Sequence, residues 1–331
     1  MKRLFYTLLF FLPCMLIACG GSDDTPDGDN NPPVVAPPSE EPVDSRLLYN
    51  GIRLPEQWPP VRSSSSELEK GMSPFYLSDK PSVINISVGR QLFVDNFLIE
   101  STNLKRTFYY PEYYSGNPIL TPEQDWEKTG TKGAAFAAPF SDGVWYDEKE
   151  GKYKMWYMAG GGSYATSGAG VTCYAESTDG IHWTKPTLSI VAGTNIVDYN
   201  SERDASVIWL DKQESNASKR YKMFLVTRES GKWRYRYKTS PDGKVWRAAA
   251  QSEPIADRST VYKNPFRNVW VYSMRHNIRV DANKLVRARD YNENADPEAG
   301  TKKAEALLSA FWFGPWANEQ HHTDYPNIAP A

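Results

Sequence analysis

Short runs of aromatic and aliphatic residues alternate with polar turns along this chain, and one such arrangement occurs twice. Tyr-Lys-Met-Trp-Tyr-Met at 153–158 matches Tyr-Lys-Met-Phe-Leu-Val at 221–226. Each is followed by a Ser-x-Asp-Gly-x-x-Trp sequence, at 177–183 and at 240–246. Both copies are typical of a buried strand, a further strand and an Asp-Gly turn that leads to a Trp. A repeat of about 60 residues can hold a four-stranded antiparallel sheet, so the pattern predicts an all-β fold, a β-propeller.

The strand pattern places three propeller blades in the chain. The first runs from about 134 to 186 and the second from 201 to 247. The third begins at 257, with 268–275 as its central strand. Three blades and fragments cannot close a ring of the usual four to eight. We therefore expect an incomplete propeller, either a truncated product, which we favour, or a chain that completes itself by oligomerising.

Other segments of the mature chain surround these blades. Prolines and serines interrupt residues 46–80, which we interpret as an extended N-terminal arm. Strands are predicted at 83–86 and 91–100, and helical character at 298–313 indicates a short helical insertion. The predicted domain, a partial propeller, thus covers 81–331.

The N-terminus has the features of a targeting segment. Lys2 and Arg3 precede an apolar run over 4–17, which is too short to span a bilayer comfortably and is typical of a secretory signal. Leu16-Ile17-Ala18-Cys19 resembles the bacterial lipobox. The resemblance implies that residues 1–19 are a signal peptide and that Cys19 becomes the lipidated N-terminus. An ordinary signal with a chance Cys is the alternative.

Residues 20–45 are rich in Asp, Glu and Pro and contain no Lys or Arg. Such a segment cannot bury a core, so we interpret it as a disordered acidic tether. Its first residues, Gly-Gly-Ser-Asp-Asp at 20–24, resemble the acidic export signal of bacterial surface lipoproteins. This resemblance implies an outer-membrane or cell-surface location, with membrane contact through the lipid anchor only.

Charge and cysteine content exclude some classes of function. The net charge of −2 argues against nucleic acid as a partner. Cys14 would leave with the signal and Cys19 would carry the lipid, so no disulfide framework is expected. Cys173 lies in an apolar strand, which favours a packed core thiol over a nucleophile.

Aromatic residues are abundant, with 11 Trp and 20 Tyr. They fill blade cores and also stack on sugar rings, so their number is compatible with either role. Near the C-terminus, His321, His322 and Asp324 could ligate a metal, but adjacent histidines on a strand point to opposite faces. We therefore expect no metal and no other cofactor.

The most specific local signal is Glu-Arg-Asp-Ala-Ser-Val-Ile-Trp at 202–209, which opens the second blade. It resembles the Arg-Asp-Pro segment of glycoside hydrolase family 32, a five-bladed propeller related to family 43, with Ala205 in place of the usual Pro. The resemblance implies five blades of four antiparallel strands. It also implies that Asp204 stabilises an oxocarbenium-like transition state and that Arg203 contacts substrate. Alternatively, Asp204 simply pairs with its neighbour Arg203.

One blade later, Asp-Arg-Ser-Thr-Val-Tyr at 257–262 is similar to the place where that family carries its general acid, normally a Glu. The resemblance implies that Asp257 protonates the leaving oxygen and that Arg258 contacts substrate. Because Asp is one methylene shorter than Glu, Glu253 remains an alternative acid. A plain surface-turn Asp257 is the third interpretation.

Two residues compete as the acid of the first blade. Asp95 lies in Gln-Leu-Phe-Val-Asp-Asn-Phe-Leu-Ile-Glu at 91–100, where an acid within an apolar run is otherwise unexpected. Asp142 directly precedes a strand, as the family 32 nucleophile does. That family, however, places its Asp three residues before the glycine, where this chain has Phe140. We prefer Asp95 and interpret Asp142 as part of an Asp-Gly turn.

Most of the chain from residue 47 onward resembles a large group of secreted bacterial proteins that are similar to family 32 hydrolases. The resemblance includes Phe-Ala-Ala-Pro at 136–139, Val-Trp-Tyr-Asp at 144–147 and Asn-Pro-Phe-Arg at 264–267. The Ser-x-Asp-Gly-x-x-Trp sequences are also similar to the Asp-box of sialidases, although we interpret them as turns that lock a hairpin.

These resemblances imply a surface lipoprotein glycoside hydrolase that cleaves a furanoside or related glycan. Asp95, Asp204 and Asp257 would be its catalytic residues, and Trp145 would contact the oligosaccharide or polysaccharide substrate. Two alternatives stay open: a glycan-binding lipoprotein without catalysis, and an inactive truncated remnant.

Overall fold

The computed structural model describes residues 44, 46–48, 50–58, 80–87, 92–93, 96, 99–128, 135–160, 170–199, 202–279, 285–304 and 311–313. The chain divides into two units, 1–43 and 44–331, and every described residue belongs to the second. The predicted signal peptide, Cys19 and nearly all of the tether therefore lie outside the described residues. No helix in the described ranges combines the length and the apolarity that crossing a bilayer requires.

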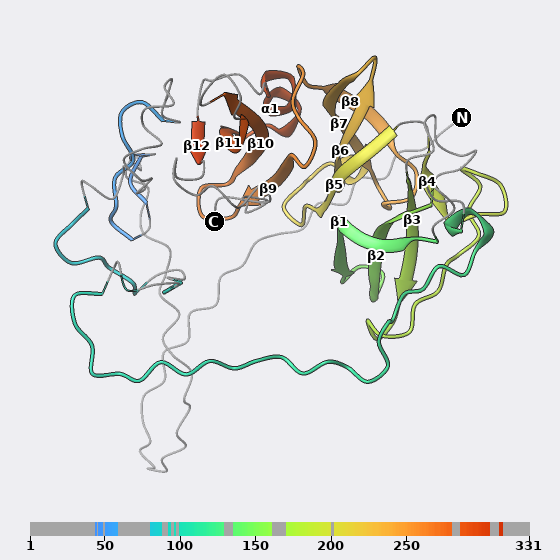
Figure 1. Cartoon of the computed structure of the whole chain (residues 1–331), viewed down its shortest axis with the longest axis horizontal. Helices are drawn as coiled ribbons and strands as arrows, with labels where there is room; N and C mark the ends of the chain where they lie inside the picture. Colours follow the sequence, from blue (N-terminus) through green and yellow to red (C-terminus); the bar gives the residue numbers. More distant parts are fainter. Residues whose placement is uncertain are drawn as a thin grey trace, which may run out of the picture. The chain divides into compact units, whose positions relative to one another are not determined.

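The described residues form three four-stranded antiparallel sheets, coloured green, yellow to gold, and orange to red in Figure 1. The first sheet consists of β1 (Ala137–Asp147), β2 (Lys152–Ala159), β3 (Val171–Ser177) and β4 (Ile196–Asp198). The second consists of β5 (Glu202–Leu210), β6 (Tyr221–Glu229), β7 (Lys232–Ser240) and β8 (Arg247–Gln251). The third consists of β9 (Thr260–Asn264), β10 (Val269–Arg279), β11 (Leu285–Asn294) and β12 (Phe311–Phe313). The helical elements are η3 (Asp125–Glu127), η6 (Ala217–Lys219) and α1 (Pro297–Lys303).

Within each sheet the strands follow one another in chain order, and the repeated runs form the second strand. Strands β2 and β6 are buried over most of their length. Burial on both faces explains why their sequences are nearly continuous hydrophobic runs rather than alternating ones. The predicted repeat is therefore confirmed as two equivalent strands of successive sheets, with β10 in the same place in the third.

The first strands of consecutive sheets contact one another, β1 with β5 and β5 with β9. The Ser141 hydroxyl donates to the Ser206 carbonyl at 2.9 Å, and the Trp145 indole donates to the Ile208 carbonyl at 2.7 Å. Up-and-down sheets joined through their first strands have the arrangement of neighbouring propeller blades. The number of blades in a complete ring stays a prediction.

The two Asp-Gly turns have the same hydrogen bonds, which confirms their interpretation as locks. In each, the serine hydroxyl accepts from the glycine N–H at 2.9 Å, and the aspartate accepts from the following N–H at 2.8 Å. The residues are Ser177, Asp179, Gly180 and Ile181 in the first turn, and Ser240, Asp242, Gly243 and Lys244 in the second. Aspartate side chains commonly stabilise turns in this way.

The second turn also docks on the first sheet. The Trp156 indole donates to the Gly243 carbonyl at 2.7 Å, and the Lys154 ammonium donates to the Asp242 carbonyl at 3.2 Å. Gly243 has a φ of +78°, and a Cβ built on it would lie 2.3 Å from Cζ2 of Trp156. Glycine is required there both by the backbone and by the close approach of the indole.

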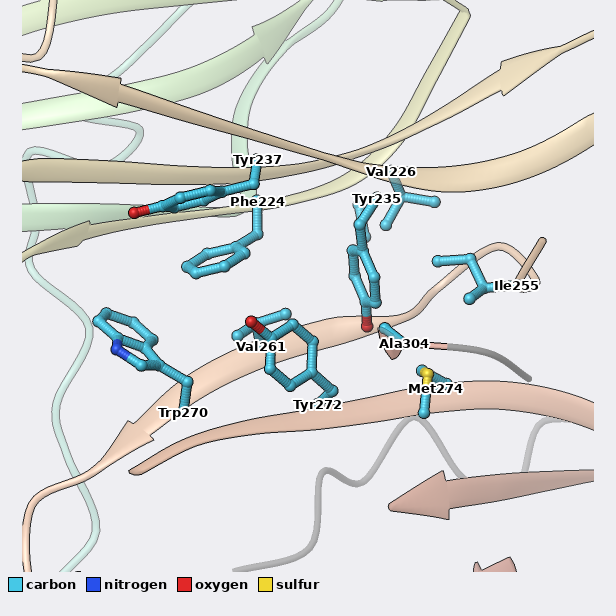
Figure 2. Packing of buried hydrophobic residues seen from close by; sticks show 11 residues of the cluster. Phe224, Val226, Tyr235, Tyr237, Ile255, Val261, Trp270, Tyr272, Met274 and Ala304 are labelled. Carbon is cyan, nitrogen blue, oxygen red and sulfur yellow. The ribbon is translucent and has the colours of Figure 1, made fainter. Parts of the chain in front are cut away.

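A second interface, between the second and third sheets, is filled largely by aromatic side chains (Figure 2). Phe224 on β6 stacks on Tyr237 of β7, with ring centroids 4.9 Å apart, and lies 5.3 Å from Trp270 of β10. Tyr272, two residues further along β10, meets Tyr235 edge to face at 5.8 Å. The spacing of two places these β10 side chains on one face, since successive strand residues alternate.

Three boundaries differ from those predicted. The first sheet extends to Asp198 rather than about 186, because the three-residue β4 follows a turn that pairs Leu188 with Thr194. The predicted strand at 83–86 is absent, and Val83 is 81% exposed there. Helix α1 ends at Lys303, and residues 311–313 pair with β11 as a strand instead of continuing a helix.

Candidate functional site

The candidate site lies where β5 and β9 begin. Asp204 stands at a β-bulge between Arg203 and Ser206, and bulges redirect side chains. Its Oδ2 accepts the backbone N–H of Arg258 at 2.5 Å, and its Oδ1 lies 3.4 Å from Nε of Arg258. An acid of the second sheet thereby binds the residue that leads into the third. The alternative pairing of Asp204 with Arg203 is wrong for the side chain, because the hydrogen bonds from Arg203 to Asp204 are made to the Asp204 backbone carbonyl and not to its carboxylate.

Asp257 lies next in sequence to Arg258, the residue that Asp204 contacts, and two residues separate it from the start of β9. The Asp257 carboxylate pairs with Arg275 of β10, and the Asp257 side chain is 31% exposed. Arg275 thus links the Asp257 carboxylate to β10. The alternative acid Glu253 is 63% exposed and lies 3.6 Å from Arg234.

Arg258 has a strained backbone, with a φ of +59°. Two other non-glycine residues among those described have a positive φ, Ser230 and Asn268, and both lie in turns between paired strands. A strained backbone conformation persists only where the surrounding structure enforces it, and such residues are common at functional sites. The Arg258 guanidinium lies 4.5 Å from the ring centroid of Phe140, a cation–π contact. We call Phe140, Asp204, Asp257, Arg258 and Arg275 the β5–β9 site.

Asp142, the competing acid of the first blade, is buried in the sheet and paired with an arginine. It lies inside β1 rather than in an Asp-Gly turn, so that interpretation is wrong. Its side chain is fully buried, and its Oδ1 lies 2.9 Å from Nη1 of Arg203. The same Arg203 nitrogen donates to the Thr172 hydroxyl at 2.8 Å. Both groups are buried, and Arg203 ties the start of β5 to β1 and β3 through these bonds. Its contact with a substrate stays a prediction.

Trp145 is placed at the contact between β1 and β5. Its ring meets that of Trp209 at 4.9 Å, in addition to the hydrogen bond to Ile208. Packing between sheets accounts for this side chain, and its contact with a sugar stays a prediction. Asp95 lies outside the described residues, so its place relative to the β5–β9 site stays a prediction as well.

Two other kinds of chemistry, a reactive thiol and a metal site, can be judged within the described residues. Cys173 is buried, and burial raises the pKa of its thiol, so it is a packed core residue as expected. Within the described ranges, no group of three or more His, Cys, Asp or Glu could hold a metal ion. His321, His322 and Asp324 lie outside these ranges.

Sequence reasoning missed Phe140, Arg275 and Arg289. Arg289 of β11 is 1% exposed and donates to the Arg258 carbonyl at 2.7 Å and to the Ser273 carbonyl at 3.2 Å. The sequence does place Arg275 and Arg289 in strands beside apolar residues. An arginine in such a strand is a candidate for a buried, paired guanidinium, and this was the available signal. Their convergence could not be read from the chain, since it depends on the register of β10 and β11.

A separate buried ionic network lies at the other end of the same strands. Asp147, at the end of β1, binds Arg220 through two hydrogen bonds of 2.8 and 2.5 Å and accepts from the Tyr221 hydroxyl. The Lys154 ammonium lies 3.1 Å from the same carboxylate, and both side chains are fully buried. Burial alone would raise the pKa of Asp147, but these partners outweigh it and hold that pKa below its ordinary value.

The second sheet repeats this arrangement. Lys222, the counterpart of Lys154, lies 3.1 Å from Asp211 at the end of β5 and 2.9 Å from Glu214. Lys263 of β9 reaches Asp211 at 3.1 Å. The polar residue in each Tyr-Lys-Met run therefore belongs to a buried ionic link toward the next sheet, far along the strands from the β5–β9 site.

No family model matches the chain, and no curated protein matches it. Several of the solved structures that it resembles are glycoside hydrolases. A glycosyl hydrolase from Bacteroides ovatus shares 13% identity with a TM-score of 0.30, over 59% of this chain and 60% of that one. A family 32 β-fructofuranosidase from Bombyx mori shares 14% identity with a TM-score of 0.36, over 49% of this chain and 35% of that one.

A third similar structure is an α-L-arabinanase from Cellvibrio cellulosa, complexed with arabinohexaose. It shares 9% identity with a TM-score of 0.33, over 58% of this chain and 66% of that one. The chain thus spans between 35% and 66% of the length of these three proteins. Similarity at this level transfers no residue role and no activity to the chain.

Proposed function

We propose that this protein is a glycoside hydrolase that acts on a furanoside or related glycan at the β5–β9 site. The observation that supports this proposal most directly is the contact of Asp204 with Arg258, which follows Asp257 in the sequence. A glycosidase needs two carboxylates on either side of the scissile bond, and sites at the ends of rigid strands hold such groups in place. The family 32 resemblance of residues 202–209 supports a furanoside.

In this proposal Asp204 is the acceptor that binds sugar hydroxyls and stabilises positive charge in the transition state. Its side chain is 14% exposed and held by two contacts to Arg258, so it is both reachable and fixed. Asp257 is the proposed proton donor. The ion pair between Asp257 and Arg275 would open when the sugar binds, so that the Asp257 carboxyl reaches the leaving oxygen. Asp95 stays the proposed third catalytic acid.

A second function, glycan binding without hydrolysis, is favoured by the arginine partners of Asp204 and Asp257. Carboxylates that are fixed in ion pairs accept hydrogen bonds from sugar hydroxyls but do not deliver protons. An exposed aromatic ring, Phe140, lies beside them and offers a face on which a sugar could stack.

Replacement of Asp204 by asparagine distinguishes the two functions. We expect kcat for the release of reducing ends from arabinan, inulin and pectic polysaccharide to fall by about 10²- to 10³-fold, because a transition-state acceptor is lost. Folding should be nearly unchanged, since asparagine keeps an oxygen for the Arg258 N–H. The measurement pairs initial rates with thermal unfolding.

Glu148→Gln is the matched control. Glu148 is 66% exposed and lies just after β1, at the other end of the strands. It should keep full activity. Unchanged turnover in Asp204→Asn would exclude hydrolysis at this site. Absence of turnover in the unaltered protein, together with measurable polysaccharide binding, would establish the binding function instead.

We also propose that the protein is anchored to the outer membrane or cell surface through a lipid on Cys19. The lipobox-like sequence at 16–19 and the acidic tether behind it support this location. Cys19→Ala should move the protein from the membrane fraction to the soluble fraction, because acyl chains supply the anchoring energy. Fractionation followed by immunoblotting measures this, with Cys14→Ala as the control. Unchanged membrane partitioning of Cys19→Ala would contradict the proposal.

A further inference from the structure

Four arginines gather where β9 begins. Arg275 of β10 and Arg289 of β11 are direct cross-strand partners. Arg287 is the partner of Asn277 and lies two residues from Arg289, on the same face of the sheet. Arg258 precedes β9, and its carbonyl accepts from Arg289. Like charges directly opposite on a sheet are destabilising. An arrangement that places them together therefore needs a compensating group.

The carboxylates near these arginines compensate only part of the charge. Asp257 pairs with Arg275, and Asp204 pairs with Arg258. Asp290 follows Arg289 on β11, so strand alternation directs it to the other face. Among the described residues around the start of β9, the three guanidinium groups of Arg258, Arg275 and Arg287 thus have two carboxylate partners, Asp204 and Asp257.

Arg275 has a hydrogen-bond donor that is left without an acceptor. Its Nε is buried and has no hydrogen-bond partner among the described residues. Burial lowers the pKa of Arg275, and the charges of Arg287 and Arg289 lower it further, whereas Asp204 acts in the opposite direction. A buried donor without a partner costs free energy, and an anion at this place would supply the missing acceptor.

The cluster is also open to a ligand. The Arg258 side chain is 40% exposed, and Arg287 is exposed. Stacking of Arg258 over Phe140 fixes the plane of its guanidinium, which leaves the edge of that plane for hydrogen bonds. A planar guanidinium fork matches the geometry of a carboxylate and binds it with two parallel hydrogen bonds.

We propose that Arg258, Arg275 and Arg287 bind the carboxylate of a uronic acid unit, so that the substrate of the β5–β9 site is an acidic glycan. This inference rests on the proposed function, because it places an anionic subsite beside Asp204 and Asp257. The uronic acid would neighbour the sugar whose bond is cleaved. Specificity for an acidic glycan would then come from charge complementarity rather than from aromatic stacking alone.

Binding of polygalacturonate and of the same polymer after carboxyl reduction tests the inference, by isothermal titration calorimetry at low salt. We expect the acidic polymer to bind at least about tenfold more tightly, and its affinity to fall with added salt. Arg287→Gln and Arg258→Gln should each weaken this binding by roughly 10- to 100-fold, as expected for loss of hydrogen bonds to a charged group.

Arg247→Gln is the matched control, because Arg247 is an exposed arginine on β8. It should bind like the unaltered protein. Circular dichroism and thermal unfolding check that each variant is folded, and Arg287→Lys, which keeps the charge, should recover part of the affinity.

Equal affinity for the two polymers, affinity for neither, or unchanged binding in both arginine variants would overturn the inference. Tight binding of dextran sulfate without binding of polygalacturonate would overturn the carboxylate assignment. Selective binding of the acidic polymer without turnover would support the carboxylate subsite and contradict the proposed hydrolysis. Turnover of neutral polysaccharide alone would support the proposed hydrolysis and contradict the carboxylate subsite.

Discussion

Gly243→Ala is expected to destabilise the protein by about 2–5 kcal/mol, far more than the same change in the equivalent turn. A left-handed backbone costs alanine about 1–2 kcal/mol. The new methyl would also lie 2.3 Å from the Trp156 ring, and forcing extra volume into a packed interface costs about 1–3 kcal/mol. Chemical denaturation followed by tryptophan fluorescence measures the change in the free energy of unfolding.

Gly180→Ala is the matched control for this prediction. Gly180 has a φ of +77°, almost the same as Gly243, but a Cβ there would meet its nearest atom, in the Tyr153 ring, at 3.7 Å. The control therefore carries the backbone cost without the collision. Equal destabilisation by the two changes would show that the second turn does not press on Trp156.

Asp147→Ala is expected to destabilise the protein by about 3–5 kcal/mol, because it removes the carboxylate that binds Arg220 and leaves the fully buried Lys154 with Glu150 as its remaining carboxylate partner. Its neighbour Glu148 provides the control. Glu148 pairs with Lys212 at 2.6 Å, but both side chains are more than half exposed, so Glu148→Ala should cost less than about 1 kcal/mol. Comparable losses in the two variants would contradict a role for burial.

The acid dependence of stability provides a second test of Asp147. Its pKa is lowered on folding, so the unfolded chain binds the proton more readily at low pH. The stability from this group is therefore present above the ordinary Asp value of about 3.9 and is lost as the pH falls below it. Asp147→Ala should lose less stability than the unaltered protein between about pH 5 and 3, as measured by urea denaturation at each pH.

Much of the fold could be predicted because its signals are local. The Tyr-Lys-Met runs and the Asp-Gly turns each specify a structure within a few residues, and both occupy equivalent places in the structure. The first-sheet boundary was missed because β4 has only three residues. Asp142 was misread because a bulge in β1 overrides the turn preference of Asp-Gly.

The candidate site was less predictable because its contacts join distant residues. Asp204 could be singled out from its surrounding sequence, but its partner Arg258 lies 54 residues away and depends on a strained backbone. The arginines of β10 and β11 meet only through their pairing register. Phe140 carries no motif at all and is identified only by its contact with Arg258.

The docking of the Asp242–Gly243 turn on Trp156 and Lys154 has a consequence for biosynthesis. The strands of the first sheet are complete when residue 198 has appeared, but their tryptophan and lysine acquire these partners only about 45 residues later. At about 5–20 residues per second this interval lasts roughly 2–9 s. During it the nascent first sheet would expose an indole and an ammonium group that the finished protein buries, which makes this interval the time at which a chaperone would have most to bind.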